Sequence, residues 1–332
     1  MATPSTPQMS PMIVRAGGPF DPQEDFGLLA KLPGRWVGQG FNLIARPNLQ
    51  GTPKGQGTPV FFLELNATQE TLEFTAIGGD VPNRGSIELT AELHAIHYLQ
   101  SVTDIIAMTA IHKEPGLWVH VPITAEGGET YVRHAVIPHG DALLAQSTFF
   151  TTVNGGPDIK PVNSFPFPIA DPIPALNADP AHPLGAPYTD PYTNPVEGPN
   201  GNAFPADVLP GNPDGTNLDP ATTIKDPTQV LLAQISDQNI ASTDVIVIST
   251  VPPPSGILNI PFVVKNANAV QMDAIFWIET VNRDPEVIPY LNGGNGDARK
   301  SQFYQLQYVQ RVILDFDNLH WPHVSVATLI KE

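Results

Sequence analysis

The sequence contains no cysteine. This absence excludes disulfide bonds, zinc or iron held by thiolates, and a cysteine nucleophile. A metal ion held by this chain would therefore need histidine, carboxylate, tyrosine or methionine ligands.

Basic residues and long apolar runs are also scarce. The chain has 16 Lys and Arg against 33 Asp and Glu, which gives a net charge of −17. Nucleic acids and anionic membranes attract basic patches, so we expect neither as a partner. No run of about 18 apolar residues occurs that could span a membrane. The polar, Pro-rich residues 1–7 do not have the pattern of an export signal, so we expect a cytoplasmic protein.

The remaining pattern predicts β-structure. Short runs of alternating apolar and polar residues, separated by Gly, Pro and Asn, show little helical periodicity. The predicted strands are Arg35–Ile44, Val60–Leu65, Thr71–Ile77, Ile87–Leu93, Ile96–Val102, Ala107–His112, Leu117–Pro122, Thr130–Ile137, Ala142–Thr152, Ile240–Val251, Ile257–Lys265, Ala274–Val281, Phe303–Leu314 and His323–Lys331. The Glu114-Pro115-Gly116 segment is expected to be a turn. This spacing favours an all-β fold, an antiparallel up-and-down barrel.

Residues 155–225 form a Pro-rich insertion, hereafter the insert, that interrupts the strands. It holds 16 of the 37 prolines and, unlike a flexible linker, carries aromatic residues such as Phe165, Phe167, Tyr188 and Tyr192. We expect an extended arm that lies over the barrel or over a neighbouring subunit. Asp226-Pro227-Thr228 then predicts one short helix to about Ile235. The expected organisation is an N-terminal extension, 1–25, and a single barrel domain, 26–332, which the insert interrupts.

The last predicted strand carries the candidate ligand residue. Alternation places His323, Ser325 and Ala327 on one face, so an imidazole stands beside two small side chains. If this face looks into the barrel, the space beside a good metal ligand suits a flat cofactor such as heme. A satisfied polar residue near a strand end is the alternative.

Three segments, in this order, resemble the nitrobindin family of heme-binding barrels. They are Leu32-Pro33-Gly34-Arg35-Trp36-Val37-Gly38-Gln39-Gly40, Tyr98-Leu99-Gln100 followed by Ile111-His112-Lys113-Glu114-Pro115-Gly116-Leu117-Trp118, and His323-Val324-Ser325-Val326-Ala327-Thr328-Leu329. The resemblance covers about 26–153 and 269–329 and leaves out the insert. The chain departs from the family at His97, which precedes Tyr98, and at Ile111, where the family often has methionine.

This resemblance implies a ten-stranded barrel that binds heme b, with His323 as the axial ligand of the iron. It also implies that His112 lies on the pocket wall, as the candidate catalytic residue. The other pocket residues it implies are Ile111, Trp36, Gly38, Tyr98, Gln100, Ser325 and Ala327. The expected chemistry is that of ferric iron with a diatomic or peroxide ligand: nitric oxide binding, peroxynitrite isomerisation or weak peroxidase turnover. The aromatic rings of the insert are expected to cover the exposed edge of the heme.

Other readings remain open. The barrel could be a metal-free carrier of an apolar small molecule, as fatty-acid-binding proteins and lipocalins are, with His323 as a polar anchor. It could instead be a scaffold for assembly through the insert, for example as a homodimer. A zinc site is disfavoured, because the spacing of His94 with His97, and of His320 with His323, puts each pair on opposite faces.

Overall fold

The computed structural model describes residues 25–48, 61–77, 81–83, 91–124, 127–186, 188–195, 197, 201–283 and 301–332. The predicted N-terminal extension, apart from Asp25, lies outside these ranges, and so do the first four residues of the predicted strand Ile87–Leu93.

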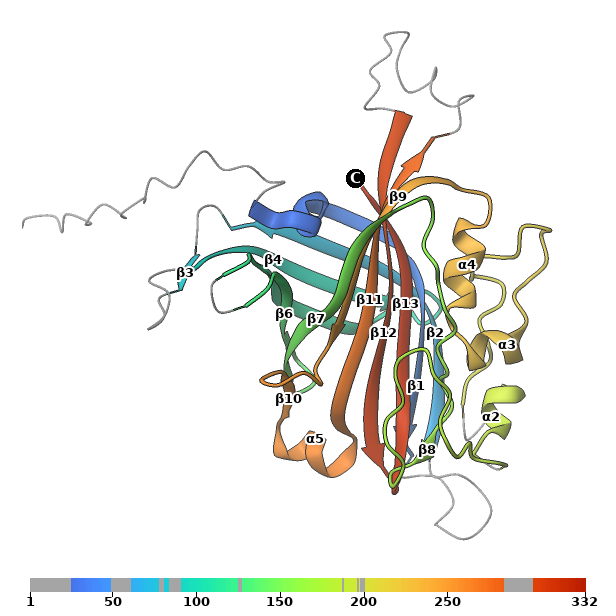
Figure 1. The fold of residues 1–332 in the computed structure, drawn as a ribbon. Helices are drawn as coiled ribbons and strands as arrows, with labels where there is room; N and C mark the ends of the chain where they lie inside the picture. The colour runs from blue at the N-terminus through green and yellow to red at the C-terminus, as the bar shows by residue number, and fades with distance from the viewer. Residues whose placement is uncertain are drawn as a thin grey trace, which may run out of the picture.

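Ten antiparallel strands form a closed barrel (Figure 1). Its closure comes from pairing of the first strand with the last, from Trp36 opposite Lys331 to Leu43 opposite Val324. This confirms the predicted all-β antiparallel barrel. In order round the barrel the strands are β1 (Gly34–Pro47), β2 (Phe61–Ala76), β4 (Ala91–Asp104), β5 (Thr109–Val121), β6 (Thr130–Ile137), β7 (Asp141–Asn154), β9 (Asn239–Ser249), β11 (Asn268–Asn282), β12 (Gln302–Phe316) and β13 (Leu319–Lys331).

Shorter elements surround the barrel. Three extend the sheet or lie beside it, namely β3 (Val81–Asn83), β8 (Phe167–Pro168) and β10 (Gly256–Asn259). The helices are η1 (Gly27–Lys31), α2 (Asp190–Thr193), α3 (Pro220–Lys225), α4 (Gln229–Ile235) and α5 (Pro261–Asn266). Of the helices in the described part of the chain, none has the length and apolarity that crossing a bilayer requires. The predicted short helix corresponds to α4. The strand predicted over Ile257–Lys265 is confirmed only for its first three residues, which belong to β10, and is wrong beyond them, because Pro261 begins α5.

Two strands are longer than the sequence predicts. β2 is one continuous strand, although a polar stretch separates its two predicted halves. Its Asn66, Thr68 and Glu70 are buried and alternate along the strand. β5 likewise runs straight through the predicted turn at Glu114-Pro115-Gly116.

The residues at the predicted turn have other roles in β5. Pro115 lies just beyond the last pair that β5 makes with β6, Gly116 with Ala135. A proline is tolerated where the ladder ends, because it has no N–H to donate. Gly116 is required because a Cβ there would lie 2.5 Å from the Tyr98 ring. The turn prediction is therefore wrong.

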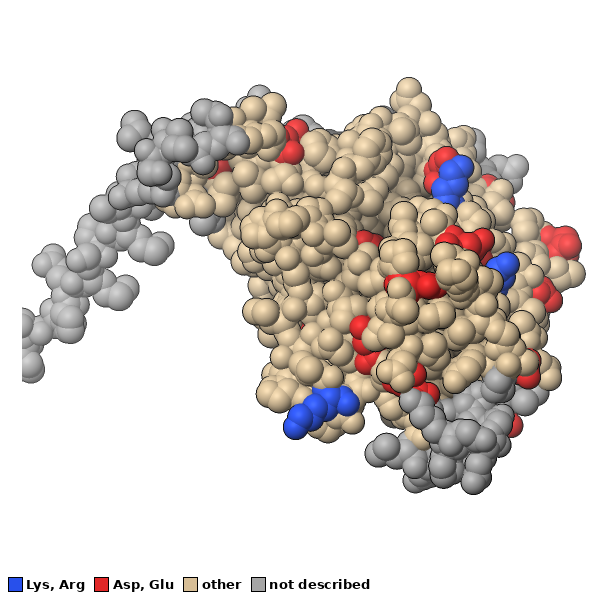
Figure 2. All heavy atoms as spheres, turned by 60° about the horizontal axis from the view of Figure 1, so that its bottom comes forward, with Lys and Arg blue, Asp and Glu red and all other residues tan. Residues whose placement is uncertain are grey.

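The barrel interior differs between its two ends. The upper end of Figure 1, near the C-terminus, is apolar: Trp36 is buried, donates from Nε1 to the Leu32 carbonyl over 2.7 Å, and packs in one cluster with Leu29 of η1. The lower end, where β13 begins, carries polar side chains. Figure 2 turns this lower end forward and shows more Asp and Glu than Lys and Arg on its face.

The insert lies against the outer face of the barrel. Tyr192 is buried, with its ring 6.2 Å from Phe61, and the Tyr188 ring is 6.3 Å from that of Trp321. Phe165 packs on Tyr192 at 5.1 Å, and β8 brings Phe167 to 4.9 Å from His320. The prediction that these rings cover an exposed heme edge is therefore wrong, because they cover outward-facing side chains of β2 and the start of β13.

Two polar anchors hold the insert in place. Arg311 of β12 is buried and donates to the Pro174 carbonyl at 2.8 Å and to Asp273 at 2.9 Å. Asn202 bonds both main-chain groups of Leu65, at 2.8 and 2.6 Å. Because β4 pairs with β2 only from Thr68 onward, Asn202 satisfies an edge that would otherwise be open.

Candidate functional site

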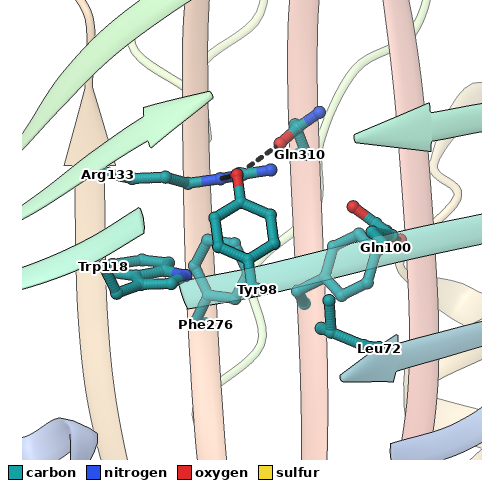
Figure 3. A pocket seen from close by; sticks show the side chains of 8 residues that line it. Leu72, Tyr98, Gln100, Trp118, Arg133, Phe276 and Gln310 are labelled. Atoms are coloured by element: carbon teal, nitrogen blue, oxygen red, sulfur yellow. Dashed lines mark hydrogen bonds between the residues drawn. The ribbon is translucent and has the colours of Figure 1, made fainter. Parts of the chain in front are cut away.

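A buried ion pair lies inside the barrel; Figure 3 draws its cation, Arg133, beside Tyr98 and Gln310. Arg133 of β6 forms a salt bridge with Glu114 of β5, and the exposed fraction of both side chains is 3% or less. Arg133 also donates from Nε to the Tyr98 hydroxyl at 3.0 Å and from Nη1 to Gln310 at 2.7 Å. The Tyr98 hydroxyl in turn donates to Glu114. Pairing and hydrogen bonds together make this burial of charge possible.

The charges of this network shift its titration. Burial alone would raise the pKa of Glu114, but the Arg133 charge and hydrogen bonds from His112 and Tyr98 outweigh it and lower that pKa to about 2. Burial raises the pKa of Tyr98 well above its usual value, and the Glu114 charge adds to this effect. At neutral pH Glu114 is therefore ionised and Tyr98 is a neutral hydrogen-bond donor.

A second buried carboxyl group lies one strand away from this pair, on the other side of Gln100 of β4. Glu70 of β2 accepts from Tyr308 at 2.7 Å, from Gln100 at 3.2 Å and from Thr68 at 3.1 Å. Burial raises the pKa of Glu70 in spite of these bonds. Glu70 has no cation as close to it as Arg133 is to Glu114. Burial therefore favours the protonated form of Glu70.

Little empty space remains beside these two networks. A cavity of about 10 Å³ is lined by residues of both, together with Trp118, Phe276 and Leu72 (Figure 3). This is room for about one water molecule. Pockets for small organic ligands measure about 300–1,000 Å³. This cavity is therefore too small for an organic ligand.

Three histidines come together at the lower end of the barrel. The rings of His112 on β5 and His139, in the turn before β7, lie 5.5 Å apart. His323 on β13 is near enough for both to act on its charge. Burial, and then repulsion by His112 and His139, lower its pKa to about 3, so His323 is neutral at physiological pH. Asp141 is close as well: burial raises its pKa, and the two histidine charges oppose that effect.

Hydrogen bonds fix the protonation of His323. Its Nε2 lies 2.7 Å from Asn42 Oδ1, which also accepts from Ser325 at 2.8 Å. Asn42 donates from Nδ2 to Asn66 Oδ1 at 3.1 Å, and Asn66 donates to Asp104 at 2.6 Å. This chain orients the Asn42 amide with its oxygen toward the imidazole. His323 Nε2 is therefore the protonated nitrogen.

The structure brings some of the predicted site residues together and separates others. His323, Ser325 and His112 lie at the lower end, and Tyr98 and Gln100 belong to the polar networks above them. Trp36, Gly38 and Ala327 lie farther up the β1–β13 seam, away from His323. The roles that the resemblance implies for these residues stay predictions.

Small residues on this seam leave no open space. A Cβ on Gly38 would lie 1.9 Å from the Thr328 carbonyl oxygen, so this glycine permits close approach of β1 and β13. Ala327 is fully buried in the apolar cluster. Ile111 is the unpaired residue at a β-bulge beside Val102, and its main chain hydrogen-bonds the His139 ring.

Sequence reasoning missed several residues of this region: Asn42, Asn66, Glu70, Arg133, His139, Tyr308 and Gln310. For all of them except His139, which lies in the turn before β7, the available signal was their position at every second residue of a strand. Within the described ranges, no group of three or more His, Asp or Glu is arranged to hold a metal ion.

Fold and site together define a closed ten-stranded β-barrel with buried polar networks and with three histidines at its lower end, hereafter the histidine-lined mouth. No family model and no curated protein matches the chain. Among solved structures, the crystal structure of Rv2717c from M. tuberculosis is similar, with a TM-score of 0.39 and 10% identity over 94% of this chain and 97% of that one. A likeness at this distance assigns no residues and no ligand.

Proposed function

We propose that the protein binds a small ligand at the histidine-lined mouth of the barrel, and that heme b, held through His323, is this ligand. The observation that carries the proposal is the cluster of His323, His112 and His139 at one end of the barrel, where the His112 and His139 rings lie 5.5 Å apart and His323 is held by Asn42 at 2.7 Å. Burial lowers the pKa of His323 to about 3, which favours its neutral form. Neutral imidazole is the form that binds iron, so protons do not compete for it.

The residues at the mouth fit heme in their chemistry, while the space beside them limits where it can bind. The donor fits, since His323 is neutral, with His112 and His139 close by as further polar groups. The space does not extend upward, because the networks of Arg133 and Glu70 fill the barrel above. Binding at Nε2 would require His323 to leave its Asn42 partner and to move the proton to Nδ1. When bound, ferric heme would supply a site for nitric oxide or a peroxide.

The test is titration of the purified chain with hemin, followed by the Soret absorbance. We expect a saturable band from the wild type and its loss in His323→Ala, with recovery on addition of imidazole. His134→Ala is the matched control, because His134 is exposed on β6. Equal Soret bands in wild type and His323→Ala would overturn the assignment of the ligand.

A metal-free carrier is the second candidate, favoured by the bond between His323 Nε2 and Asn42. In that case His323, Ser325 and Asn42 would anchor a polar group of a small organic molecule at the mouth. A protein that is colourless as purified and takes up no hemin would support this function. Mass spectrometry of a denatured extract would then identify what the barrel carries.

A further inference from the structure

A second, larger cavity lies beside the first residues of β2, which contribute side chains from both faces of the strand. It has a volume of about 560 Å³ and lies between β2, the β4–β5 turn and the insert. This volume is within the range of about 300–1,000 Å³ for small-molecule sites. Part of the insert, around Phe204 and Asp207, forms one wall. The insert therefore closes one side of the cavity, beside the part of β2 that β4 leaves unpaired.

The walls of this cavity combine apolar and acidic side chains. Phe62 and Phe204 line it together with Ile106, which is 63% exposed although it is apolar. Carboxylates line it as well, among them Asp104 and Asp207. An exposed apolar surface beside carboxylates favours a ligand that has an apolar body and a positive charge.

A cation is already held in this way on one wall. The Arg46 guanidinium lies over the Phe62 ring, 5.4 Å from its centroid, and pairs with Glu64 at 2.5 Å. Both residues line the cavity. The wall thus holds a cation between an aromatic face and a carboxylate, two recognised partners for positive charge. Arg46 is the one basic residue among the cavity-lining residues that the structure describes.

The carboxylates do not converge on one point. No group of three or more His, Asp or Glu among the described residues is arranged as a metal site. Charges spread around an apolar wall fit an organic cation better than a metal ion.

We propose that this cavity binds a small organic cation, an amine that carries an apolar group. Its apolar group packs against Phe62, Phe204 and Ile106, and its ammonium group faces Asp207 and the other carboxylates of the wall. This inference does not depend on heme binding, since the cavity is lined by none of the three histidines of the mouth.

The cavity also communicates with the mouth. Asn66 lines the cavity and bonds Asp104 at 2.6 Å, and its Oδ1 accepts from Asn42, which holds His323. A cation beside Asp104 would therefore act on the chain of hydrogen bonds that orients the imidazole. The resonances of His323 should shift when the cavity is filled, whereas those of the exposed His182, in another part of the insert, should not.

Calorimetric titration of the full chain, without hemin and at low salt, tests the proposal with 2-phenylethylamine as the ligand. The neutral 2-phenylethanol and the anionic 3-phenylpropionate are matched comparisons of similar size. We expect the amine to bind about tenfold more tightly than the alcohol, as a charge-assisted contact contributes, and the anion to bind least. The preference for the amine over the alcohol should fall as the salt concentration is raised.

Two variants at exposed positions locate the site without threatening the fold. Asp207→Asn removes one charge and Ile106→Ser removes apolar contact, and each should weaken amine binding by about three- to tenfold. Asp158→Asn, at an exposed pair with Lys160 elsewhere in the insert, should leave it unchanged. Equal binding of amine and alcohol, or unchanged amine binding in both site variants, would overturn the proposal. A failure of hemin uptake would leave this result unaffected.

Discussion

Replacement of Arg133 by methionine should destabilise the folded protein by about 3–5 kcal/mol, the range for removing one partner of a buried ion pair. In this variant Glu114 stays buried without its cation, while methionine fills a similar volume. Tyr98 and Gln310 also lose a donor each. The destabilisation should therefore come from an uncompensated charge and unsatisfied acceptors, and little of it from lost packing.

The titration of Glu114 gives an independent magnitude. Its pKa of about 2 in the folded protein lies below the ordinary value of 4.5. A depressed carboxyl pKa contributes stability that is present above pH 4.5 and is lost as the pH falls toward 2. The difference corresponds to about 3 kcal/mol, in agreement with the first estimate. Without Arg133, burial should raise the pKa of Glu114, so this part of the acid lability should disappear.

Urea unfolding at neutral pH and at about pH 3 measures both effects. The double variant Arg133→Met with Glu114→Gln should be more stable than Arg133→Met alone, because it no longer buries a lone charge. Arg35→Met is the control, since Arg35 pairs with Glu332 at the exposed surface and should contribute about 1 kcal/mol or less. A loss below about 1 kcal/mol in Arg133→Met, or no recovery in the double variant, would refute the reasoning.

Three further predictions concern the insert, a buried acid and the barrel seam. Arg311→Met combined with Asp273→Asn should expose the insert to faster cleavage by proteinase K within 155–225, since its carbonyl anchor is lost; an unchanged cleavage rate would contradict this. Burial raises the pKa of Glu279 to about 7, so the wild type should lose about 3 kcal/mol of stability as the pH rises from 4.5 to 7. Glu279→Gln should lack this loss, and a constant stability difference between the two proteins from acid to alkaline pH would count against it. Gly38→Ala should destabilise the folded protein by about 1–3 kcal/mol or more and so lower its thermal midpoint, because the added Cβ would lie 1.9 Å from the Thr328 carbonyl oxygen. Gly127→Ala is the control and should leave the thermal midpoint unchanged, because the space around Gly127 is open. Equal midpoints for the two variants would show that the β1–β13 seam tolerates the methyl group.

The barrel itself could be predicted because alternation of apolar and polar residues is a local signal. Where the interior is polar, this signal fails. Asn66, Thr68 and Glu70 are as polar as loop residues, so β2 was divided in two, although these side chains are buried. Pro115 and Gly116 have turn composition, yet the end of a strand pairing and the Tyr98 ring explain them.

The site was predictable only in part, for a similar reason. The alternation of side chains along a strand predicts that His323 and Ser325 lie on the same face. The hydrogen-bond partner of His323, Asn42, is 281 residues away in the sequence and is brought near only by the pairing of β1 with β13. Arg133 and Glu114 likewise meet only through the pairing of β5 with β6. Composition predicted an extended, aromatic-bearing insert, but it holds no information on which face of the barrel the insert covers.

The most direct test of the central claim is the nitrogen spectrum of ¹⁵N-labelled histidine side chains, recorded from about pH 8 to about pH 4.5 and again with hemin, since an unperturbed histidine titrates near pH 6.5. The account predicts that His323 stays neutral with its proton on Nε2 throughout this range, and that its signals are lost to the paramagnetic iron when hemin binds. Titration of His323 near its ordinary pKa, or signals left unchanged by bound hemin, would contradict it.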